Sequence, residues 1–258
     1  MIQSVSFIGA GRVTMLMIKG LERMAPGRFY YTVSDMSAPA LDRIKAAFPD
    51  ITISQSNNEI PVQTDIVFLA LHPPVLLETL RQIKDEIPPN AFVVSLAPKV
   101  TLDQMCAAAG RRDTLARVIP NAPSVVNAGY NPVAFSTAVP GESKESILEF
   151  LSILGDVREV PEEQLESYAI VTAMGPTYLW FQMYKLLSLA ESFGIPQENA
   201  LEGIVSMMKG AAQTMVDCDL PPEEIMDLVA VKPLKEDEGV FASAYDDRLQ
   251  ALYARLKS

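Results

Sequence analysis

The chain has 258 residues, of which 49% are hydrophobic and 21% are charged, and its formal net charge is −11 at pH 7. A chain of this size and composition can bury the cores of two domains. Because its acidic charge repels phosphate backbones and anionic membrane surfaces, we expect a small-molecule partner and neither nucleic acid nor a membrane.

The chain is poor in metal-binding and disulfide-forming side chains. Cys106 and Cys218 lie far apart, and His72 is the single histidine. This set predicts no disulfide framework and no metal site, and we expect both thiols to be buried in a reducing cytoplasm. The segment MIQSVSFIGAG has no signal-length apolar run, and the apolar stretches are shorter than the roughly 18 residues of a membrane-spanning helix.

Short apolar runs rich in Val, Ile and Phe alternate with segments of helical period from residue 4 to about residue 160. Such runs are typical of strands buried on both faces of a parallel sheet. We predict strands at 4–8, 29–34, 51–54, 66–71, 92–97, 115–119, 131–136 and 157–160. The pattern predicts a Rossmann-type, doubly wound, mostly parallel sheet in a dinucleotide-binding domain of residues 1–160.

After Pro161 the apolar residues follow helical spacing only, so residues 161–258 are predicted to form an all-helical domain. One helix carries an apolar stripe that includes Leu179 and Met183, and another follows Pro196. The methionine-rich stripe of the second helix predicts core packing rather than a cofactor site. Because apolar surface lies on more than one side, we expect a homodimer or a higher homo-oligomer through this region.

A glycine pair follows the first predicted strand and precedes a helix expected at 12–24. Gly9 allows a tight turn, and Gly11 lets backbone N–H groups approach a pyrophosphate at the positive end of that helix. Thr14 occupies the third small position of the fingerprint, which predicts a slightly wider spacing between helix and strand. The predicted pyrophosphate site consists of Gly9, Ala10, Gly11, Arg12 and Val13.

Asp35 ends the second predicted strand, at the distance where an acid reaches the adenine ribose. A carboxylate there repels a 2′-phosphate and favours NAD over NADP, although Arg12 and Arg43 remain candidates for lining a phosphate pocket. Alternatively, Asp35 only begins the turn before the helix that starts near Ala38.

Four segments, VSFIGAGRVTMLMIKGL, DIVFLALHPPVLLETL, FVVSLAPKVTLDQM and ARVIPNAPSVVNAGY, occur in the order in which related segments occur in a known family. Together they resemble the pyrroline-5-carboxylate reductase family, which reduces a cyclic imine to proline with NAD(P)H. The resemblance implies an NAD(P)-dependent oxidoreductase acting on C=N, with Asn121 near the nicotinamide. It also implies cofactor contacts from Ala70, His72 and Pro73.

His72 stands where members of that family usually carry lysine, at the carboxyl end of a strand, where it could donate to cofactor or substrate. The alternative is a half-buried histidine satisfied by backbone groups. The segment AMGPTYLWFQMYKLLSLAESFGI resembles the family's first long helix, whose Gly-Pro turn lies near the substrate. This resemblance implies a substrate site with Gly175, Pro176 and Tyr178, and a hinge at the Gly-Pro pair. A kink in a packed helix is the alternative.

One family feature is missing. A Ser-Pro-Gly-Gly-Thr-Thr loop binds the substrate carboxylate in the family, whereas residues 232–237 here read KPLKED. Either Lys232 and Lys235 bind an acidic substrate, or the loop is solvated surface. We take Thr172, Thr177 and Lys232 as the candidate catalytic residues. Two other functions stay open: a dinucleotide-binding regulator without chemistry, and a deazaflavin-linked or other NAD(P) oxidoreductase of the same fold.

Overall fold

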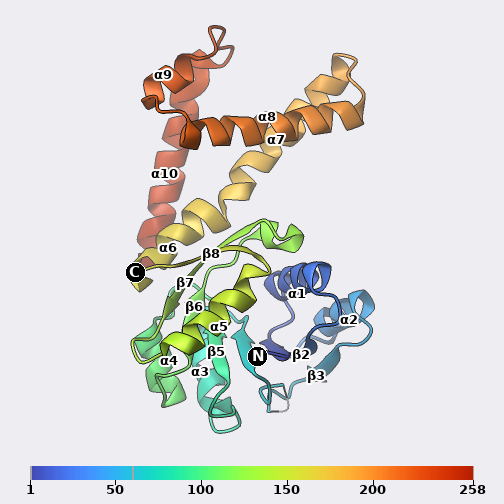
Figure 1. Ribbon diagram of the computed structural model, residues 1–258, viewed down its shortest axis with the longest axis vertical. Helices are drawn as coiled ribbons and strands as arrows, with labels where there is room; N and C mark the ends of the chain where they lie inside the picture. Colours follow the sequence, from blue (N-terminus) through green and yellow to red (C-terminus); the bar gives the residue numbers. More distant parts are fainter. Residues whose placement is uncertain (1, 60, 258) are drawn as a thin grey trace. The chain divides into compact units, whose positions relative to one another are not determined.

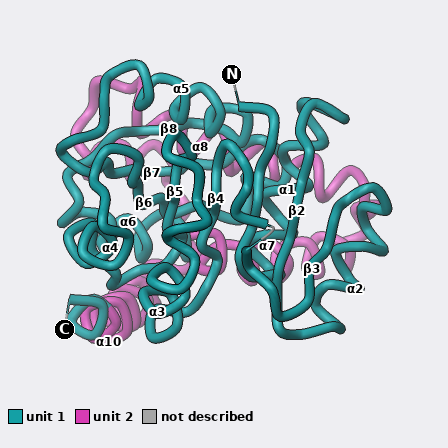
Figure 2. Tube along the Cα trace, turned by 90° about the horizontal axis from the view of Figure 1, so that it is seen from below, with its two compact units in different colours: residues 1–174, 253–258 teal, residues 175–252 magenta. Residues whose placement is uncertain are grey.

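The structure is a computed structural model that describes residues 2–59 and 61–257. The chain forms two compact units (Figure 2). The first contains residues 1–174 and 253–258, and the second contains residues 175–252.

The first unit is built on an eight-stranded sheet with the order β3-β2-β1-β4-β5-β6-β7-β8 (Figure 1). Its strands are β1 (Ser4–Ile8), β2 (Tyr30–Asp35), β3 (Thr52–Gln55), β4 (Ile66–Leu69), β5 (Phe92–Ser95), β6 (Leu115–Val118), β7 (Gly129–Phe135) and β8 (Gly155–Glu159). Neighbouring strands are parallel except for β6 and β7, which are antiparallel. The predicted strands are all found, with no end displaced by more than two residues, because strand ends are the least determined part of the pattern.

Helices cover both faces of this sheet. They are α1 (Arg12–Met24), α2 (Ala38–Ala47), α3 (Pro73–Ile83), α4 (Leu102–Ala109), α5 (Gly141–Ser152) and α6 (Leu165–Tyr168), with 3₁₀ turns η1 (Ala122–Val126) and η2 (Glu162–Gln164) and a π-helical turn η3 (Ala169–Ala173). Neighbouring β1 residues face opposite layers: Phe7 packs with α1, α2 and α5, and Ile8 packs with α3, α4 and α6. This alternation confirms the predicted doubly wound fold.

The boundary between the units lies after Met174 rather than after residue 160. Leu165 and Ala169 are buried in the core layer of α3 and α4, which fixes α6 and η3 to the first unit. Pro176 lies in the first turn of α7 (Gly175–Ser192), where a missing N–H breaks no helical hydrogen bond. The pair therefore starts a helix and does not kink a helix interior.

A buried ion cluster also holds this segment. Arg117 of β6 is 1% exposed, and its Nη1 and Nη2 lie 2.8 Å from Glu162 Oε1 and 2.6 Å from Glu166 Oε1. Glu166 accepts a further hydrogen bond from the N–H of Lys99, and Glu162 accepts one from the N–H of Leu102. The cluster ties the loops after β5 and β8 to the central sheet.

The second unit is helical, as predicted. It contains α7, α8 (Gln197–Asp217), α9 (Pro222–Asp227), η4 (Lys235–Asp237) and most of α10 (Glu238–Lys257). The expectation of a methionine-rich core was wrong for the single chain, since only Leu187 and Ala200 are buried in this unit and Met215 is 73% exposed. The last turn of α10 belongs to the first unit: Leu256 packs on its core, and Lys257 Nζ donates to the carbonyl oxygen of Glu163. No helix in the described part of the chain is long and apolar enough to cross a membrane.

Candidate cofactor and active site

The turn after β1 has the geometry that the glycine pair predicts. Gly9 has φ +111°, and a Cβ atom at this position would overlap the carbonyl oxygen of Ala70. Its N–H donates to the Ser34 carbonyl oxygen at 2.7 Å, so the turn lies between the carboxyl ends of β2 and β4. A Cβ at Gly11 would meet no atom within 4 Å, which leaves room for a ligand to approach the backbone.

The start of α1 is suited to an anion. Gly11 is the N-cap, no described side chain caps the helix, and its first turn contains no acidic residue. Uncapped N–H groups and the helix dipole favour a phosphate there. Thr14 is fully buried, and its Oγ1 donates to the Gly9 carbonyl oxygen at 2.6 Å, so the third fingerprint position ties the helix to the turn. These residues fit a dinucleotide pyrophosphate.

Asp35 is directed at the glycine turn. Its Oδ2 accepts the N–H of Ala10 and its Oδ1 accepts the N–H of Ser37, both at 2.7 Å. The carboxylate thus begins the turn before α2 and also borders the predicted nucleotide site. Sequence reasoning missed Asn58, whose Oδ1 accepts a hydrogen bond from Ser34 Oγ at the same edge. The parallel pairing of β2 with β3 brings it there, and no local motif indicates it.

His72 is the N-cap of α3 and Pro73 follows in the first helical turn. The His72 carbonyl oxygen accepts the N–H groups of Val75 and Leu76, at 3.0 and 3.2 Å. His72 is exposed, so the alternative of a half-buried histidine satisfied by backbone groups was wrong. The side chain remains available at the carboxyl end of β4.

Asn121 follows β6 and is 7% exposed. Its Oδ1 accepts the N–H of Tyr130 at 3.0 Å, and its Nδ2 donates to the Thr172 carbonyl oxygen at 3.4 Å. Thr172 Oγ1 in turn donates to the carbonyl oxygen of Tyr168 at 2.8 Å. The structure therefore brings Asn121 and Thr172 together, but it commits the Thr172 hydroxyl to the helix backbone.

The remaining candidates, Gly175, Pro176, Thr177, Tyr178 and Lys232, belong to the second unit. The first four start α7, and the Tyr178 ring packs edge-on against Tyr245 at 5.7 Å. Lys232 Nζ lies 2.6 Å from Asp227 Oδ1, and this hydrogen bond lowers the pKa of Asp227. Lys235 pairs with Glu238 at 2.8 Å. These local pairs favour the solvated reading of residues 232–237.

The described residues offer no support for a metal site. Within residues 2–59 and 61–257, no group of three or more His, Cys, Asp or Glu side chains is arranged to hold a metal ion.

Comparison with known proteins agrees with this geometry. A family model described as NADP oxidoreductase, coenzyme F420-dependent, matches residues 4–99. Pyrroline-5-carboxylate reductase of Escherichia coli strain K12 is 26% identical over 233 residues, which cover 88% of this chain and 84% of that protein. The Plasmodium falciparum pyrroline carboxylate reductase structure with NADP bound is 17% identical, with a TM-score of 0.80 over 99% of this chain and 97% of that one. A Coxiella burnetii pyrroline-5-carboxylate reductase structure is 24% identical, with a TM-score of 0.69 over 99% and 95%. These findings confirm the resemblance to the pyrroline-5-carboxylate reductase family over most of the chain.

Proposed function

We propose that this protein is an NAD(P)H-dependent reductase that transfers a hydride to the C=N bond of a cyclic imine, as its pyrroline-5-carboxylate reductase relatives are named for doing. The observation that carries the proposal is the glycine turn with an uncapped α1 start at the sheet edge that also holds Asn121. It is supported by the similarity to reductases over most of the chain.

The bound cofactor would supply the hydride, and the chain would hold and orient the reactants. We assign the pyrophosphate to Gly9, Ala10, Gly11, Arg12 and Val13, the adenine ribose to Asp35, and the nicotinamide to Ala70, His72, Pro73 and Asn121. We assign the substrate to Gly175, Pro176 and Tyr178, and the candidate catalytic residues remain Thr172, Thr177 and Lys232.

The test follows NADH and NADPH absorbance with purified protein and pyrroline-5-carboxylate, beside other cyclic imines and keto acids. We expect oxidation of the cofactor that depends on a cyclic imine. Cofactor binding without turnover of any imine or keto acid would contradict the proposal and favour a regulator that has lost chemistry.

We further propose that NADH is preferred, because the Asp35 carboxylate borders the nucleotide edge and would repel a 2′-phosphate. Replacing Asp35→Asn should lower the ratio of the NADPH dissociation constant to the NADH dissociation constant by about tenfold, which corresponds to roughly 1.4 kcal/mol. Fluorescence titration with NADH and NADPH measures this ratio. Asp42→Asn, an exposed acid on α2, is the matched control. Tighter binding of NADPH by the unchanged protein would refute the assignment.

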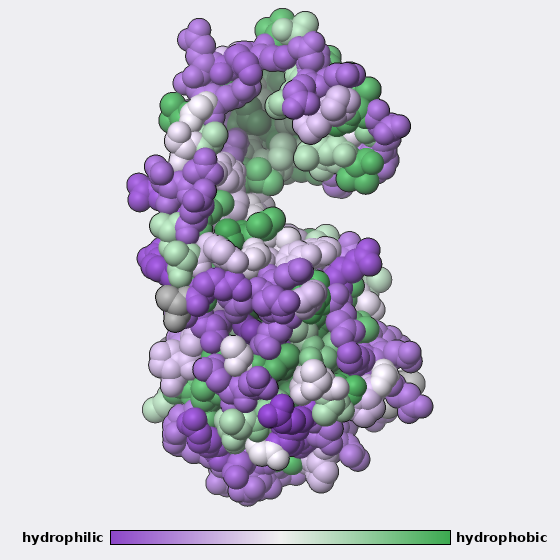
Figure 3. All heavy atoms as spheres, turned by 90° about the vertical axis from the view of Figure 1, so that its left-hand side faces the viewer, coloured by the Kyte–Doolittle hydropathy of each residue, from purple (hydrophilic) through white to green (hydrophobic). Residues whose placement is uncertain are grey.

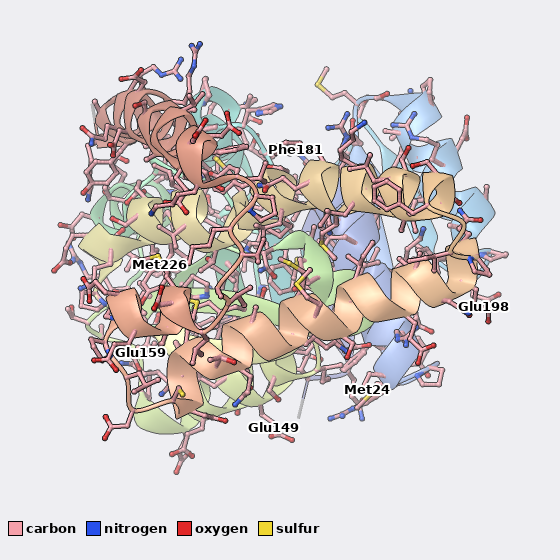
Figure 4. The ribbon with its side chains drawn as sticks, turned by 90° about the horizontal axis from the view of Figure 1, so that it is seen from above. Met24, Glu149, Glu159, Phe181, Glu198 and Met226 are labelled. Atoms are coloured by element: carbon pink, nitrogen blue, oxygen red, sulfur yellow. The ribbon has the colours of Figure 1, made fainter. Side chains whose placement is uncertain are left out.

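The second unit supports the proposal of a homodimer. Its helices expose large apolar side chains, and apolar residues gather on the surface of this unit in Figure 3. Among them are Phe181, which is 63% exposed, and Met226, which is 61% exposed; both are labelled in Figure 4. With Leu187 and Ala200 as its buried residues, the unit has too little core of its own, and a second copy offers matching apolar helices.

Sedimentation equilibrium should give about twice the 28.2 kDa chain mass. Phe181→Glu should shift the equilibrium toward monomer, because a charge is costly in an apolar interface. Met24→Glu, at a residue 68% exposed in the first unit, should leave the mass unchanged. A monomeric unchanged protein at micromolar concentration would contradict the proposal.

A cytoplasmic location is also proposed. Both cysteines are free thiols, as expected for a reducing compartment. Cys106 is buried, and its Sγ lies 3.7 Å from Ser136 Oγ, whereas Cys218 is half-buried rather than buried as predicted.

A further inference from the structure

Two tyrosines pack together beside the proposed nicotinamide site. Tyr130 is the second residue of β7, and Tyr168 ends α6. Their ring centroids are 5.9 Å apart with an angle of 33° between the planes. Both side chains are half-buried, so a ligand can reach them.

The antiparallel direction of β7 places Tyr130 at the ligand edge of the sheet. Val133 pairs with Val118 of β6, and the Ile119 N–H donates to the Pro132 carbonyl oxygen at 3.1 Å. Following β7 backward along this ladder leads past the carboxyl end of β6, which is the side where open sheets bind ligands. The N–H of Tyr130 donates to Asn121 Oδ1, so the start of β7 lies beside the segment that follows β6.

Tyr168 is also linked to Asn121, through hydrogen bonds of Thr172. The Thr172 hydroxyl donates to the Tyr168 carbonyl oxygen, and the Thr172 carbonyl oxygen accepts from Asn121 Nδ2. These contacts span η3, in which the Met174 N–H reaches back to the Ala169 carbonyl oxygen as in a π-helix. π-helical turns are frequent at functional sites.

The groups around Tyr130 keep its hydroxyl protonated at neutral pH. Burial of the side chain and the neighbouring Tyr168 hydroxyl raise the pKa of Tyr130, and Asp156 of β8 acts in the same direction. Arg158 of β8 acts in the opposite direction and would stabilise a phenolate if one formed.

Resting on the proposed function, we propose that Tyr130 is the proton donor to the substrate nitrogen during imine reduction, and that Tyr168 is a positioning residue that orients its hydroxyl.

The step balances with one reductant, a dihydronicotinamide. Its hydride forms the new C–H bond with its own electron pair, and the π pair of the C=N bond moves to nitrogen. The nitrogen forms an N–H bond with the proton of Tyr130 as the O–H bond breaks. The phenolate, beside Tyr168 and Arg158, then takes a proton from water.

Two substrates distinguish a role of Tyr130 in proton donation from a role in packing alone. A neutral cyclic imine, 1-pyrroline, needs a proton at nitrogen, whereas the N-methyl-1-pyrrolinium ion is already cationic and needs none. At a pH above the imine's own pKa, Tyr130→Phe should lower kcat on 1-pyrroline by about a hundredfold and Tyr168→Phe by about tenfold. Both variants should keep kcat on the N-methyl ion within about twofold, because phenylalanine preserves the ring packing.

A readout without cofactor accompanies the kinetics. Because burial also raises the pKa of Tyr31 and Tyr178, the readout is the difference between the ultraviolet titrations of the unchanged protein and Tyr130→Phe. This difference should show a tyrosine that ionises above the usual value of about 10, and in a Tyr168→Phe background it should move back toward that value. Tyr30→Phe, at a residue 78% exposed at the amino end of β2, is the matched control and should change neither readout.

Three results would overturn the inference. Equal loss on both substrates would show that Tyr130 acts only through structure. Unchanged kcat on 1-pyrroline would exclude it as the donor. An unchanged protein that reduces neither these two substrates nor pyrroline-5-carboxylate would overturn the proposed function and this inference with it, whereas the first two results leave the proposed function standing.

Discussion

Replacing Arg117→Met should destabilise the first unit by about 3–5 kcal/mol, because it leaves the buried carboxylate of Glu166 without its cation. Chemical denaturation followed by circular dichroism measures the change. Arg112→Met is the matched control: its partner Asp103 is exposed, and loss of an exposed pair costs about 0–1 kcal/mol. An effect of similar size in both variants would contradict the role given to the cluster.

The same variant should change how stability depends on pH. Burial alone would raise the pKa of Glu166, but hydrogen bonds from Arg117 and from the Lys99 N–H lower it below its usual value. A carboxyl with a lowered folded pKa stabilises the protein above its unfolded pKa of about 4.3, and this contribution is lost as pH falls through the folded value. Without Arg117 the pKa should rise, since burial remains. The stability gap between the two proteins should therefore be widest near neutral pH and narrow on acidification.

Gly9→Ala and Gly11→Ala should separate folding from cofactor binding. At Gly9 a methyl group meets the Ala70 carbonyl oxygen at a φ of +111°, so we expect a loss of about 2–3 kcal/mol in unfolding free energy. At Gly11 the backbone is extended and the space around a Cβ is open, so stability should change by less than about 0.5 kcal/mol.

Cofactor affinity should instead fall in Gly11→Ala, the variant that is expected to keep its stability. Gly11→Ala places a methyl group where the pyrophosphate must approach the backbone, so the dissociation constant for NADH should rise by about tenfold or more. Fluorescence titration beside a thermal unfolding curve tests both expectations on one sample. Unchanged affinity in Gly11→Ala would mean that the dinucleotide does not lie at this turn.

The sheet could be predicted because its strands are buried on both faces and therefore differ in composition from the helices. The glycine turn and α1 were also predictable, since Gly9 and Gly11 define a local conformation. Asn58 and Tyr130 were not, because strand pairing brings them to the edge and the reversal at β7 has no local signature. The domain boundary was displaced because Arg117 and Glu166, which fix α6 to the sheet, are 49 positions apart.

The last turn of α10 has a consequence for synthesis on the ribosome. The first unit consists of residues 1–174 and 253–258, so the helical segment 175–252 is an insertion in it. Leu256 and Lys257, which follow this insertion, pack on the part of the unit that precedes it. The nascent first unit cannot acquire these contacts until residues 256 and 257 have left the exit tunnel. Closing so long a loop is slow but adds little entropic cost per added residue. Chains truncated before Leu256 should therefore have an incompletely packed first unit and be preferred substrates for proteases.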